Sequence, residues 1–270
     1  MKKLGLIHYN APGATLPEFL KWASDNGFEY AELMPPDVII DGPSDEEVFD
    51  RARAVRKLVN SYGMRVSALS ARNDFLQSDP AVIEFQVERM KKVATVVRLL
   101  DDEAVIRSEG GWEKECVPRE KWGDTLYECF ARCIEFLAAQ QVDLAIDNHG
   151  TVTNEGDMLI ALLRRLDCPH IGSNLDTMNF RWLGHDIATC NRFYKSLAPH
   201  VKHVHLKDGS GSRENYRGAA LGEGEIDLKC VVSCLSDAGY GGAYAAEYEG
   251  TEIVDGVGYV KSLAWMKAHL

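Results

Sequence analysis

Four short segments in the second half of the chain each carry an acidic residue or a histidine at the end of an apolar run. The segments are LAIDNHG (144–150), IGSNLDTMNF (171–180), HVHLKD (203–208) and YAAEYEG (244–250). Each run has the length of a buried β-strand, and carboxylates and imidazoles are the side chains that bind divalent cations in proteins. If the runs are consecutive parallel strands, their ends meet at one rim, and the sequence predicts a metal site there.

Strand-like and helix-like segments alternate from one end of the chain to the other. Strands are expected at 3–9, 29–35, 65–71, 103–109, 142–148, 170–176, 201–207 and 242–248. Amphipathic helical stretches are expected at 17–27, 43–63, 79–100, 119–140, 154–166, 184–198, 227–239 and 254–270. Eight strands alternating with eight helices predict an α/β protein, a single (β/α)₈ TIM barrel domain over residues 1–270.

Alternation along each strand tests this layout, because successive side chains point to opposite faces. If Asp147 points into the barrel, Ala145 and His149 point inward and Leu144 and Ile146 face the helices. The same rule holds in the other segments. The inward set then includes Asp176, His203, His205, Lys207, Ala245, Glu247 and Glu249. All the candidate ligands therefore lie at carboxyl ends of strands, where barrel enzymes carry their active sites.

Composition narrows the possible partners. The net charge is −11 and the pI about 5.2, with no basic stripe of the kind that nucleic-acid binding requires. Seven cysteines without a CxxC pair indicate reduced, packed thiols and a cytoplasmic protein. The apolar run after Met1 is too short for a signal peptide, and no segment approaches a membrane span of about 20 apolar residues. A homo-oligomer is compatible with this composition.

One imidazole and three carboxylates suit Mn²⁺, Mg²⁺, Co²⁺, Fe²⁺ or Zn²⁺, with positions left open for water or substrate oxygens. We favour Mn²⁺. The absence of cysteine from these strand ends argues against a structural zinc site. A single strand-end aspartate usually caps a helix, but four candidates in succession on the correct faces favour one bound divalent ion.

The segments EYAEL, IDNHG, NLDTMNF, VKHVHLKD, LGEGEID and AEYEG together resemble the xylose-isomerase-like superfamily of sugar (phosphate) isomerases and epimerases. The resemblance covers essentially the whole chain and is specific to the superfamily rather than to one reaction. It implies a metal held by a Glu, Asp, His, Glu pattern. That pattern carries onto Asp147, Asp176, His205 and Glu247, the second histidine of HVH being the ligand.

The chain departs from this pattern at its first ligand, where the superfamily usually has glutamate and this sequence has Asp147. In the epimerases the two metal-bound glutamates also act as acid and base on opposite sides of the substrate. Glu247 fits that task as the catalytic base. Asp147 is one methylene shorter, so His149, two residues later on the same face, is an alternative second proton-transfer group.

Further polar residues are expected at the same rim. We expect His8, Glu32, Asn179, Lys207 and Arg213 to bind substrate, Glu32 at a position that the superfamily often uses. Asn179 stands where the epimerases have a substrate-binding histidine, and Lys207 and Arg213 can neutralise a phosphate, a carboxylate or a developing enolate. Arg107 and Glu109 are expected beside them, and Trp112 and Trp182 are candidates for a sugar-stacking wall.

These residues favour a metal-dependent isomerase or epimerase that acts on a small sugar, keto-sugar or sugar-derived polyol through an enediolate. The alternative is a lyase or dehydratase that uses the same site on a keto-sugar or keto-inositol. A remote alternative is a nuclease like endonuclease IV, which needs a three-metal cluster with several more histidines. The expected partner is thus a small carbohydrate, with neither nucleic acid nor membrane.

Overall fold

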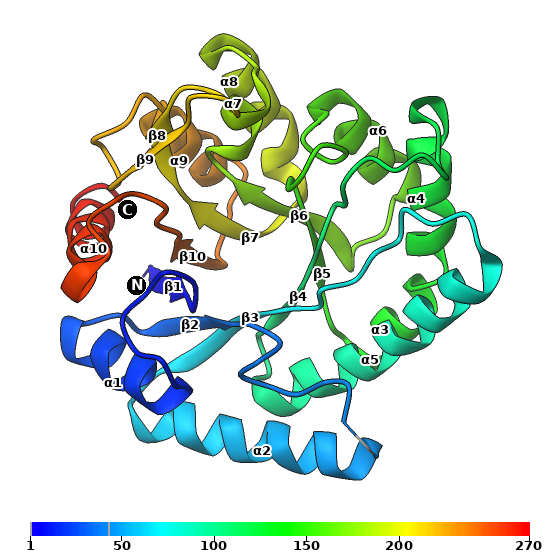
Figure 1. Cartoon of the computed structure of the whole chain (residues 1–270), viewed down its shortest axis with the longest axis horizontal. Coiled ribbons are helices and arrows are strands. Elements are labelled where there is room, and N and C mark those ends of the chain that lie inside the picture. The colour runs from blue at the N-terminus through cyan, green and yellow to red at the C-terminus, as the bar shows by residue number, and fades with distance from the viewer. Residues whose placement is uncertain (1, 43) are drawn as a thin grey trace.

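Eight parallel strands close into a barrel and the helices surround it (Figure 1). The computed structural model describes residues 2–42 and 44–270. The barrel strands are β1 (Lys3–Ile7), β2 (Tyr30–Leu33), β3 (Arg65–Ser70), β4 (Val105–Ser108), β5 (Leu144–Asp147), β6 (Ile171–Asp176), β7 (Val201–Leu206) and β10 (Ala243–Ala246). Each pairs with its neighbour in this order, and β10 returns to β1. The predicted (β/α)₈ TIM barrel is confirmed.

The helices follow the strands as expected, with several ends fixed by local chemistry. They are α1 (Leu16–Asn26), α2 (Asp45–Ser61), α3 (Pro80–Leu100), α4 (Trp122–Ala131), α5 (Ile134–Gln140), α6 (Gly156–Leu166), α7 (Asn179–Leu183), α8 (Ile187–Leu197), α9 (Leu228–Asp237) and α10 (Val257–His269). Short 3₁₀ turns are η1 (Arg119–Lys121), η2 (Ala198–His200) and η3 (Val254–Gly256). Gly27 ends α1 with a φ of 89°, a left-handed conformation that favours glycine.

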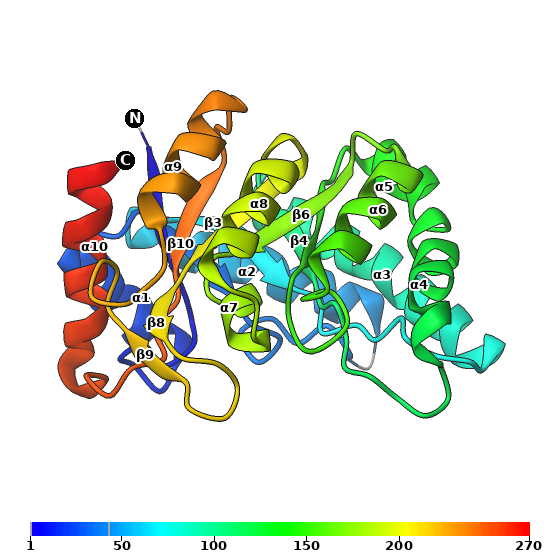
Figure 2. The same cartoon turned by 90° about the horizontal axis from the view of Figure 1, so that it is seen from above.

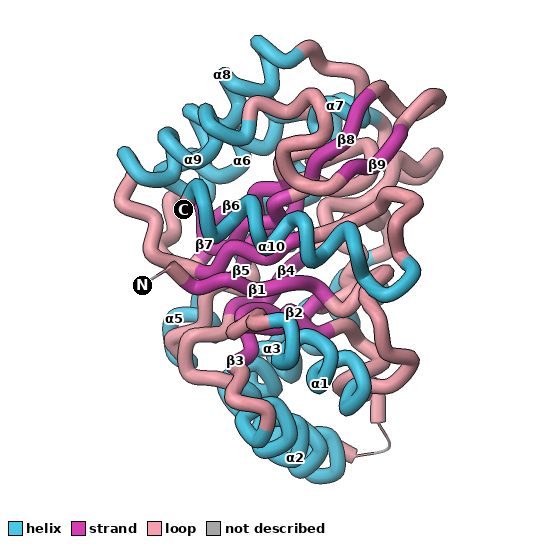
Figure 3. Tube along the Cα trace, turned by 90° about the vertical axis from the view of Figure 1, so that its left-hand side faces the viewer, coloured by secondary structure: helices cyan, strands magenta, loops and turns pink. Residues whose placement is uncertain are grey.

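Besides the short helix α7, which the sequence does not predict, two regions differ from the sequence expectation. The stretch 119–140 is not one helix, because the Cys133 N–H bonds three residues back to Phe130 O at 2.9 Å, which tightens the turn between α4 and α5. An antiparallel hairpin of β8 (Asp208–Ser210) and β9 (Arg217–Ala219) follows β7. Figures 2 and 3 show this hairpin and α7 at the end of the barrel opposite the N-terminus, beside the carboxyl ends of the strands.

The main apolar core lies between the strands and the helices, while the barrel interior holds few apolar side chains. Leu144, Ile146, Val204 and Leu206 belong to the outer core, as the alternation rule predicts. Inside the barrel, a separate small cluster consists of Ala68, Val105 and Ala145. Residues two positions further along these strands are polar, so the carboxyl end of the barrel interior is a layer of charged and amide side chains.

Two register shifts interrupt the barrel ladder. Between β2 and β3, Ala31 pairs with Val66 but Glu32 pairs with Ala68, so Ser67 is an extra residue. Between β6 and β7, Ser173 pairs with Val201 but Asn174 pairs with His203, and Lys202 is extra. Bulges of this kind re-aim the neighbouring side chains. Both lie next to residues of the polar layer.

All seven cysteines are free thiols. Within residues 2–42 and 44–270, no helix is long and apolar enough to cross a membrane.

Candidate active site

A cavity of about 220 Å³ opens at the carboxyl ends of the barrel strands. Its lining consists of Ile7, Tyr9, Met34, Arg107, Glu109, Asp147, His149, Glu247 and Glu249. Within a strand end these residues are two apart, as in Asp147 and His149, because every second side chain points inward. The inward alternation inferred from the sequence thus places the acidic groups, an arginine and a histidine around one space.

His205 lies between two buried carboxylates at this end of the barrel. Its Nε2 hydrogen-bonds with Glu32 Oε2 at 2.6 Å. Its Nδ1 lies 2.9 Å from Glu247 Oε2 and 3.9 Å from Asp176 Oδ2. Burial alone lowers the pKa of His205, but the carboxylates of Glu32 and Glu247 outweigh it and raise that pKa well above its ordinary value.

Asp176, His205 and Glu247 form a group that fits a divalent cation. They offer one ligand atom each, and these atoms lie within 4.8 Å of one another. Asp176 Oδ2 is buried without a hydrogen-bond partner among the residues that the structure describes, and His205 Nδ1, although 2.9 Å from Glu247 Oε2, makes no hydrogen bond of regular geometry with them. Buried polar atoms normally have partners, so two such atoms facing one point mark a place where a cation is expected. Burial raises the pKa of Asp176 to about 7.

Asp176 is held in place by amide groups on both sides. Its Oδ1 accepts the N–H groups of Met178 (2.8 Å) and Asn179 (2.9 Å). The Asn148 side chain clamps its backbone, accepting from Asp176 N at 2.8 Å and donating to Asp176 O at 2.9 Å. Oδ2 is consequently left to face His205 and Glu247.

Asp147, expected from the sequence to be a metal ligand, is bonded to Arg107 and Asn174 in this structure. Its Oδ2 accepts from Arg107 Nη1 at 2.9 Å, and its Oδ1 accepts from Asn174 Nδ2 at 2.8 Å. Arg107 also donates from Nε to Glu32 Oε1 at 2.5 Å, and it is 5% exposed. The aspartate is one methylene shorter than a glutamate, and both of its oxygens are already bonded. The structure therefore groups Asp147 with Arg107 and leaves it outside the cluster of Asp176, His205 and Glu247.

A second group with potential ligand atoms, Glu32, His203 and His205, shares its last member with the first. The nitrogens of His203 already have partners: Nδ1 lies 2.8 Å from Asn174 Oδ1 and Nε2 lies 3.3 Å from Ser67 Oγ. Burial lowers the pKa of His203 to about 4, so the ring is neutral at pH 7. This satisfied histidine is a poorer ligand than His205, whose Nδ1 faces the carboxylates of Asp176 and Glu247.

Lys207 brings a buried ammonium group to the same end of the barrel. Its Nζ lies 3.0 Å from Glu247 Oε1, 2.8 Å from Glu249 Oε2 and 3.8 Å from Asp176 Oδ2. Burial alone lowers the pKa of Lys207, yet these carboxylates raise it well above its ordinary value. Asn179 Oδ1 accepts a 3.4 Å bond from Nζ, which places that residue at the site as well.

Of the remaining predicted rim residues, one lines the cavity and two do not. His149 lines the cavity, and its ring meets Trp112 edge-on at 6.1 Å between centroids. Arg213 lies over the rings of Trp112 and Trp182, outside the cavity lining. His8 was expected at the rim, but its ring stacks on Phe19 at 4.0 Å and Nδ1 lies 2.8 Å from Asp37. Ile7 and Tyr9 point inward, so alternation turns His8 toward the helix layer.

The sequence places Arg107 at the rim but does not reveal its pairing, and it does not single out Asn174. A signal for each was present. Arg107 interrupts the apolar run VIRS, and Asn174 stands two residues before Asp176 on the same face of IGSNLD. Inward polar residues below a strand-end ligand are candidates to orient it.

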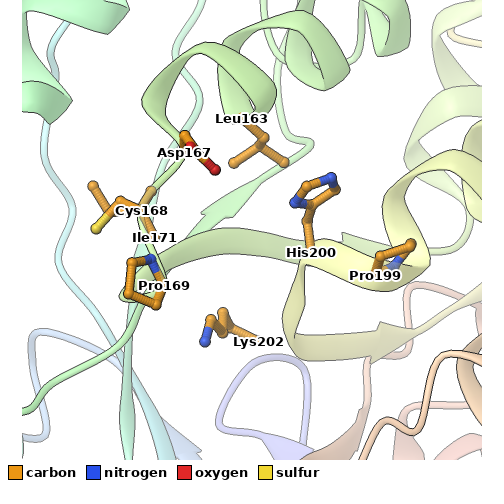
Figure 4. A pocket seen from close by; sticks show the side chains of 8 residues that line it. All are labelled: Leu163, Asp167, Cys168, Pro169, Ile171, Pro199, His200 and Lys202. Carbon is orange, nitrogen blue, oxygen red and sulfur yellow. The ribbon is translucent and has the colours of Figure 1, made fainter.

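A larger cavity of about 410 Å³ lies at the opposite end of the barrel, where β6 and β7 begin (Figure 4). Leu163, Asp167, Cys168, Pro169, Ile171, Pro199, His200 and Lys202 line it. None of these residues belongs to either group of potential ligands among the described residues. Volume alone therefore does not identify the active site, and the chemistry lies at the carboxyl ends.

Comparisons with known proteins agree with the barrel fold. A sequence model of the family described as "Xylose isomerase-like TIM barrel" matches residues 20–269. Among proteins with curated functions, none matches the chain in sequence. Solved structures match over nearly the whole chain, but below 20% identity such a likeness shows the fold alone.

Three of these structures are similar in length to this chain. An L-ribulose 3-epimerase is 18% identical, with a TM-score of 0.75 over 100% of this chain and 95% of the other. The 3-keto-D-glucoside 4-epimerase of E. coli is 12% identical, with a TM-score of 0.76 over 99% and 100%. The IOLI protein with a binding zinc atom is 14% identical, with a TM-score of 0.76 over 98% and 96%.

A fourth structure is longer. It is a fusion of a xylose isomerase-like TIM barrel with a 4-hydroxyphenylpyruvate dioxygenase, and it is 17% identical with a TM-score of 0.72. The match covers 91% of this chain and 38% of the fusion protein.

Proposed function

Because this chain belongs to the xylose isomerase-like TIM barrel family, we propose that it is a divalent-metal-dependent isomerase or epimerase. The substrate class is a small sugar, keto-sugar or sugar-derived polyol. The observation that carries the proposal is the convergence of Asp176, His205 and Glu247 at the carboxyl end of the barrel, where Glu247 also lines the cavity. The names of two structural neighbours, both sugar epimerases, support the substrate class.

Asp176 Oδ2, His205 Nδ1 and a Glu247 oxygen would hold the ion. Two carboxylates and one imidazole suit Mn²⁺, Mg²⁺, Co²⁺, Fe²⁺ or Zn²⁺, and three protein ligands leave open positions. The zinc atom in the IOLI structure supports metal binding by this fold. In this proposal Asp147 holds Arg107 instead of the ion.

A divalent ion at this position would supply Lewis acidity toward the carbonyl group of the substrate. Glu247 is the proposed base. Burial alone raises its pKa, but Lys207 and His205 lower it well below the ordinary value, so the carboxylate is ionised and can accept a proton. It takes the proton from the carbon next to the carbonyl, which leaves an enediolate.

The second proton-transfer group must return a proton to the opposite face or to the neighbouring carbon. Both oxygens of Asp147 already accept hydrogen bonds from Arg107 and Asn174. His149 lines the same cavity, and its backbone N–H and C=O are both bonded to Thr153 Oγ1 at 3.2 Å, while its ring nitrogens have no hydrogen-bond partner among the described residues. We therefore assign the return of the proton to His149.

A lyase or dehydratase is the second candidate, and Lys207 favours it. The ammonium group lies 3.0 Å from the proposed base and 2.8 Å from Glu249, where its charge and N–H groups can stabilise a leaving oxygen. The nuclease alternative has less support. Among the described residues the two ligand groups share His205, so they do not provide two independent sites, and still less the three that a nuclease of this kind needs.

Metal analysis of the purified protein, followed by solvent-deuterium exchange with a panel of ketoses and keto-inositols, tests the proposal. We expect one divalent ion per chain and deuterium at the carbon next to the carbonyl. Asp176→Ala should lose the ion. Full occupancy in that variant, or the absence of a divalent ion in wild type, contradicts the proposal. Loss of water from a substrate selects the lyase.

A further inference from the structure

Four aromatic or cationic side chains, from the segments that follow four successive barrel strands, lie beside the mouth of the cavity. Trp112 follows β4, His149 follows β5, Trp182 is in α7 and Arg213 lies between β8 and β9. The two indole rings meet edge-on with 6.0 Å between centroids. The Arg213 guanidinium carbon lies 5.9 Å from the centroid of the Trp112 ring and 5.7 Å from the centroid of the Trp182 ring. We call Trp112, Trp182 and Arg213 the rim cluster.

Contacts between the loops hold the rim cluster in place. The Arg213 N–H donates to Trp182 O at 2.7 Å, which ties the hairpin loop to α7. The Glu113 N–H, next to Trp112, donates to Thr151 Oγ1 at 2.9 Å. Gly150 has a φ of 73°, and a Cβ there would lie 2.5 Å from Gly111 O, so these two loops meet at glycine backbone. The cluster is thus preorganised, which lowers the entropy lost when a ligand binds.

The arrangement leaves the donors of Arg213 available. Guanidinium N–H groups lie in the plane of the group, whereas aromatic rings attract the cation at their faces. Neither a hydrogen bond nor an ion pair of the Arg213 side chain occurs within the part of the chain that the structure describes. This chain has eleven more acidic than basic residues, and nearby Arg181 pairs with Glu225 at 2.7 Å. Arg213 is positioned without a carboxylate of its own.

The cavity itself is unsuited to an anionic group of the substrate. Glu109, Asp147, Glu247 and Glu249 line it, and the one arginine of the lining, Arg107, is already paired. A negatively charged substituent would be repelled there. His149 lines the cavity and also touches Trp112, so the rim cluster lies one side chain away from the cavity.

We propose that the rim cluster binds an anionic group, a carboxylate or a phosphate, of a substrate whose polyhydroxy part occupies the cavity. The planar donors of Arg213 accommodate two oxygens of such a group side by side. The indole rings cover the apolar face of the carbon chain that leads to it. The inference rests on the proposed function, which it narrows from neutral sugars to sugar acids or sugar phosphates.

Tryptophan fluorescence tests the site without requiring turnover. The purified protein is titrated with D-gluconate, methyl phosphate and neutral D-glucose at constant ionic strength, since exposed charges are screened by salt. We expect a saturable change with at least one anion and a much weaker response to glucose. Gluconate and methyl phosphate separate the two sources of negative charge.

Variants of two exposed arginines in the same hairpin region provide the comparison. Arg213→Ala should lower the affinity for the anion that gives a response by at least about tenfold, because a charge-assisted hydrogen bond is lost. Arg213→Lys should recover only part, since lysine lacks the planar fork. Arg217→Ala, in β9, should bind like wild type. Equal affinity in Arg213→Ala and wild type, or no saturable response to either anion, overturns the inference.

The outcome is separable from that of the proposed function. Anion binding that depends on Arg213, in a protein without metal or deuterium exchange, supports the rim cluster and contradicts the isomerase. Metal-dependent deuterium exchange of a neutral ketose, with no fluorescence response to either anion, supports the isomerase and contradicts the rim cluster as an anion site.

Discussion

His205 Nε2 lies 2.6 Å from Glu32 Oε2, and both side chains are buried beneath the cavity. This contact orients the ring so that Nδ1 faces Asp176 and Glu247. A carboxylate bonded to the far nitrogen of a metal-binding imidazole fixes its tautomer and increases its basicity. Glu32, expected from the sequence to contact substrate, is bonded to His205 and placed to orient its ring.

Replacing Glu32 by glutamine should therefore weaken binding of a divalent ion by roughly 10–100-fold. The amide keeps the volume but removes the charge that favours an N–H on Nε2. Isothermal titration with Mn²⁺ or Zn²⁺ measures the change, and Glu103→Gln, a surface variant in an ion pair with Lys3, is the control. Wild-type affinity in Glu32→Gln contradicts an orienting role.

Binding of the ion should release protons. The ion-free protein has Asp176 with a pKa raised to about 7 by burial and His205 with a pKa well above its ordinary value. An ion needs both groups deprotonated, so its affinity should rise with pH between about 6 and 8. Titrations in buffers of different ionisation enthalpy count the protons released. An affinity for the ion that does not change with pH in this range would contradict the prediction.

The Arg107 pairs predict a large effect on stability. Arg107→Met leaves Glu32 and Asp147 without their shared cation in a buried layer, which should lower the free energy of unfolding by about 3–5 kcal/mol. Urea denaturation measures it. Adding Asp147→Asn should restore part of the loss, while the exposed control Arg53→Met should change stability little. A loss within about 1 kcal/mol, as for a surface pair, contradicts this account.

Three variants separate the proton-transfer groups. Glu247→Gln should abolish solvent-deuterium incorporation, because the amide cannot accept the proton, and His149→Ala should bind the ion but lose turnover. Asp147→Glu should bind the ion at least as well without faster turnover. Mass spectrometry of recovered substrate provides the measurement. Near-wild-type turnover in His149→Ala, with a much faster Asp147→Glu, would move the second proton transfer to residue 147.

Thiol reactivity should follow burial. Burial raises the pKa of Cys129 to about 11 and that of Cys133 to about 12, so neither forms appreciable thiolate near pH 8. Cys116 is exposed and should react first with a disulfide reagent in the native protein. Counting labelled cysteines before and after denaturation checks the order. Rapid native labelling of Cys133 would contradict the packing described for α4 and α5.

The barrel could be predicted from the sequence because its signals are local and repeated. Apolar runs alternate with amphipathic stretches, and period-2 alternation within a run such as VKHVHLK assigns each side chain to one face. Applied to β1, the same rule turns His8 outward, because Ile7 and Tyr9 on either side of it line the cavity.

The partners of Asp147 could not be predicted in the same way. Whether its carboxylate meets an ion or Arg107 depends on a difference of one methylene and on a side chain from the neighbouring strand β4. The two register shifts also leave no clear mark in the sequence. Each shift displaces the pairing by one residue, that of Glu32 along β3 and that of Asn174 along β7. Counting the strands in the sequence does not reveal such a displacement.

Those two extra residues, Ser67 and Lys202, bear on any attempt to transplant the site. Ser67 Oγ meets His203 Nε2 at 3.3 Å, and the partner of the second bulge, Asn174, bonds to both His203 and Asp147. A perfectly regular eight-stranded scaffold would lack both insertions. Copying Asp176, His205 and Glu247 onto such a scaffold would reproduce the donor atoms but shift their supports by one residue. The irregular backbone is part of the minimal unit that has to be transferred.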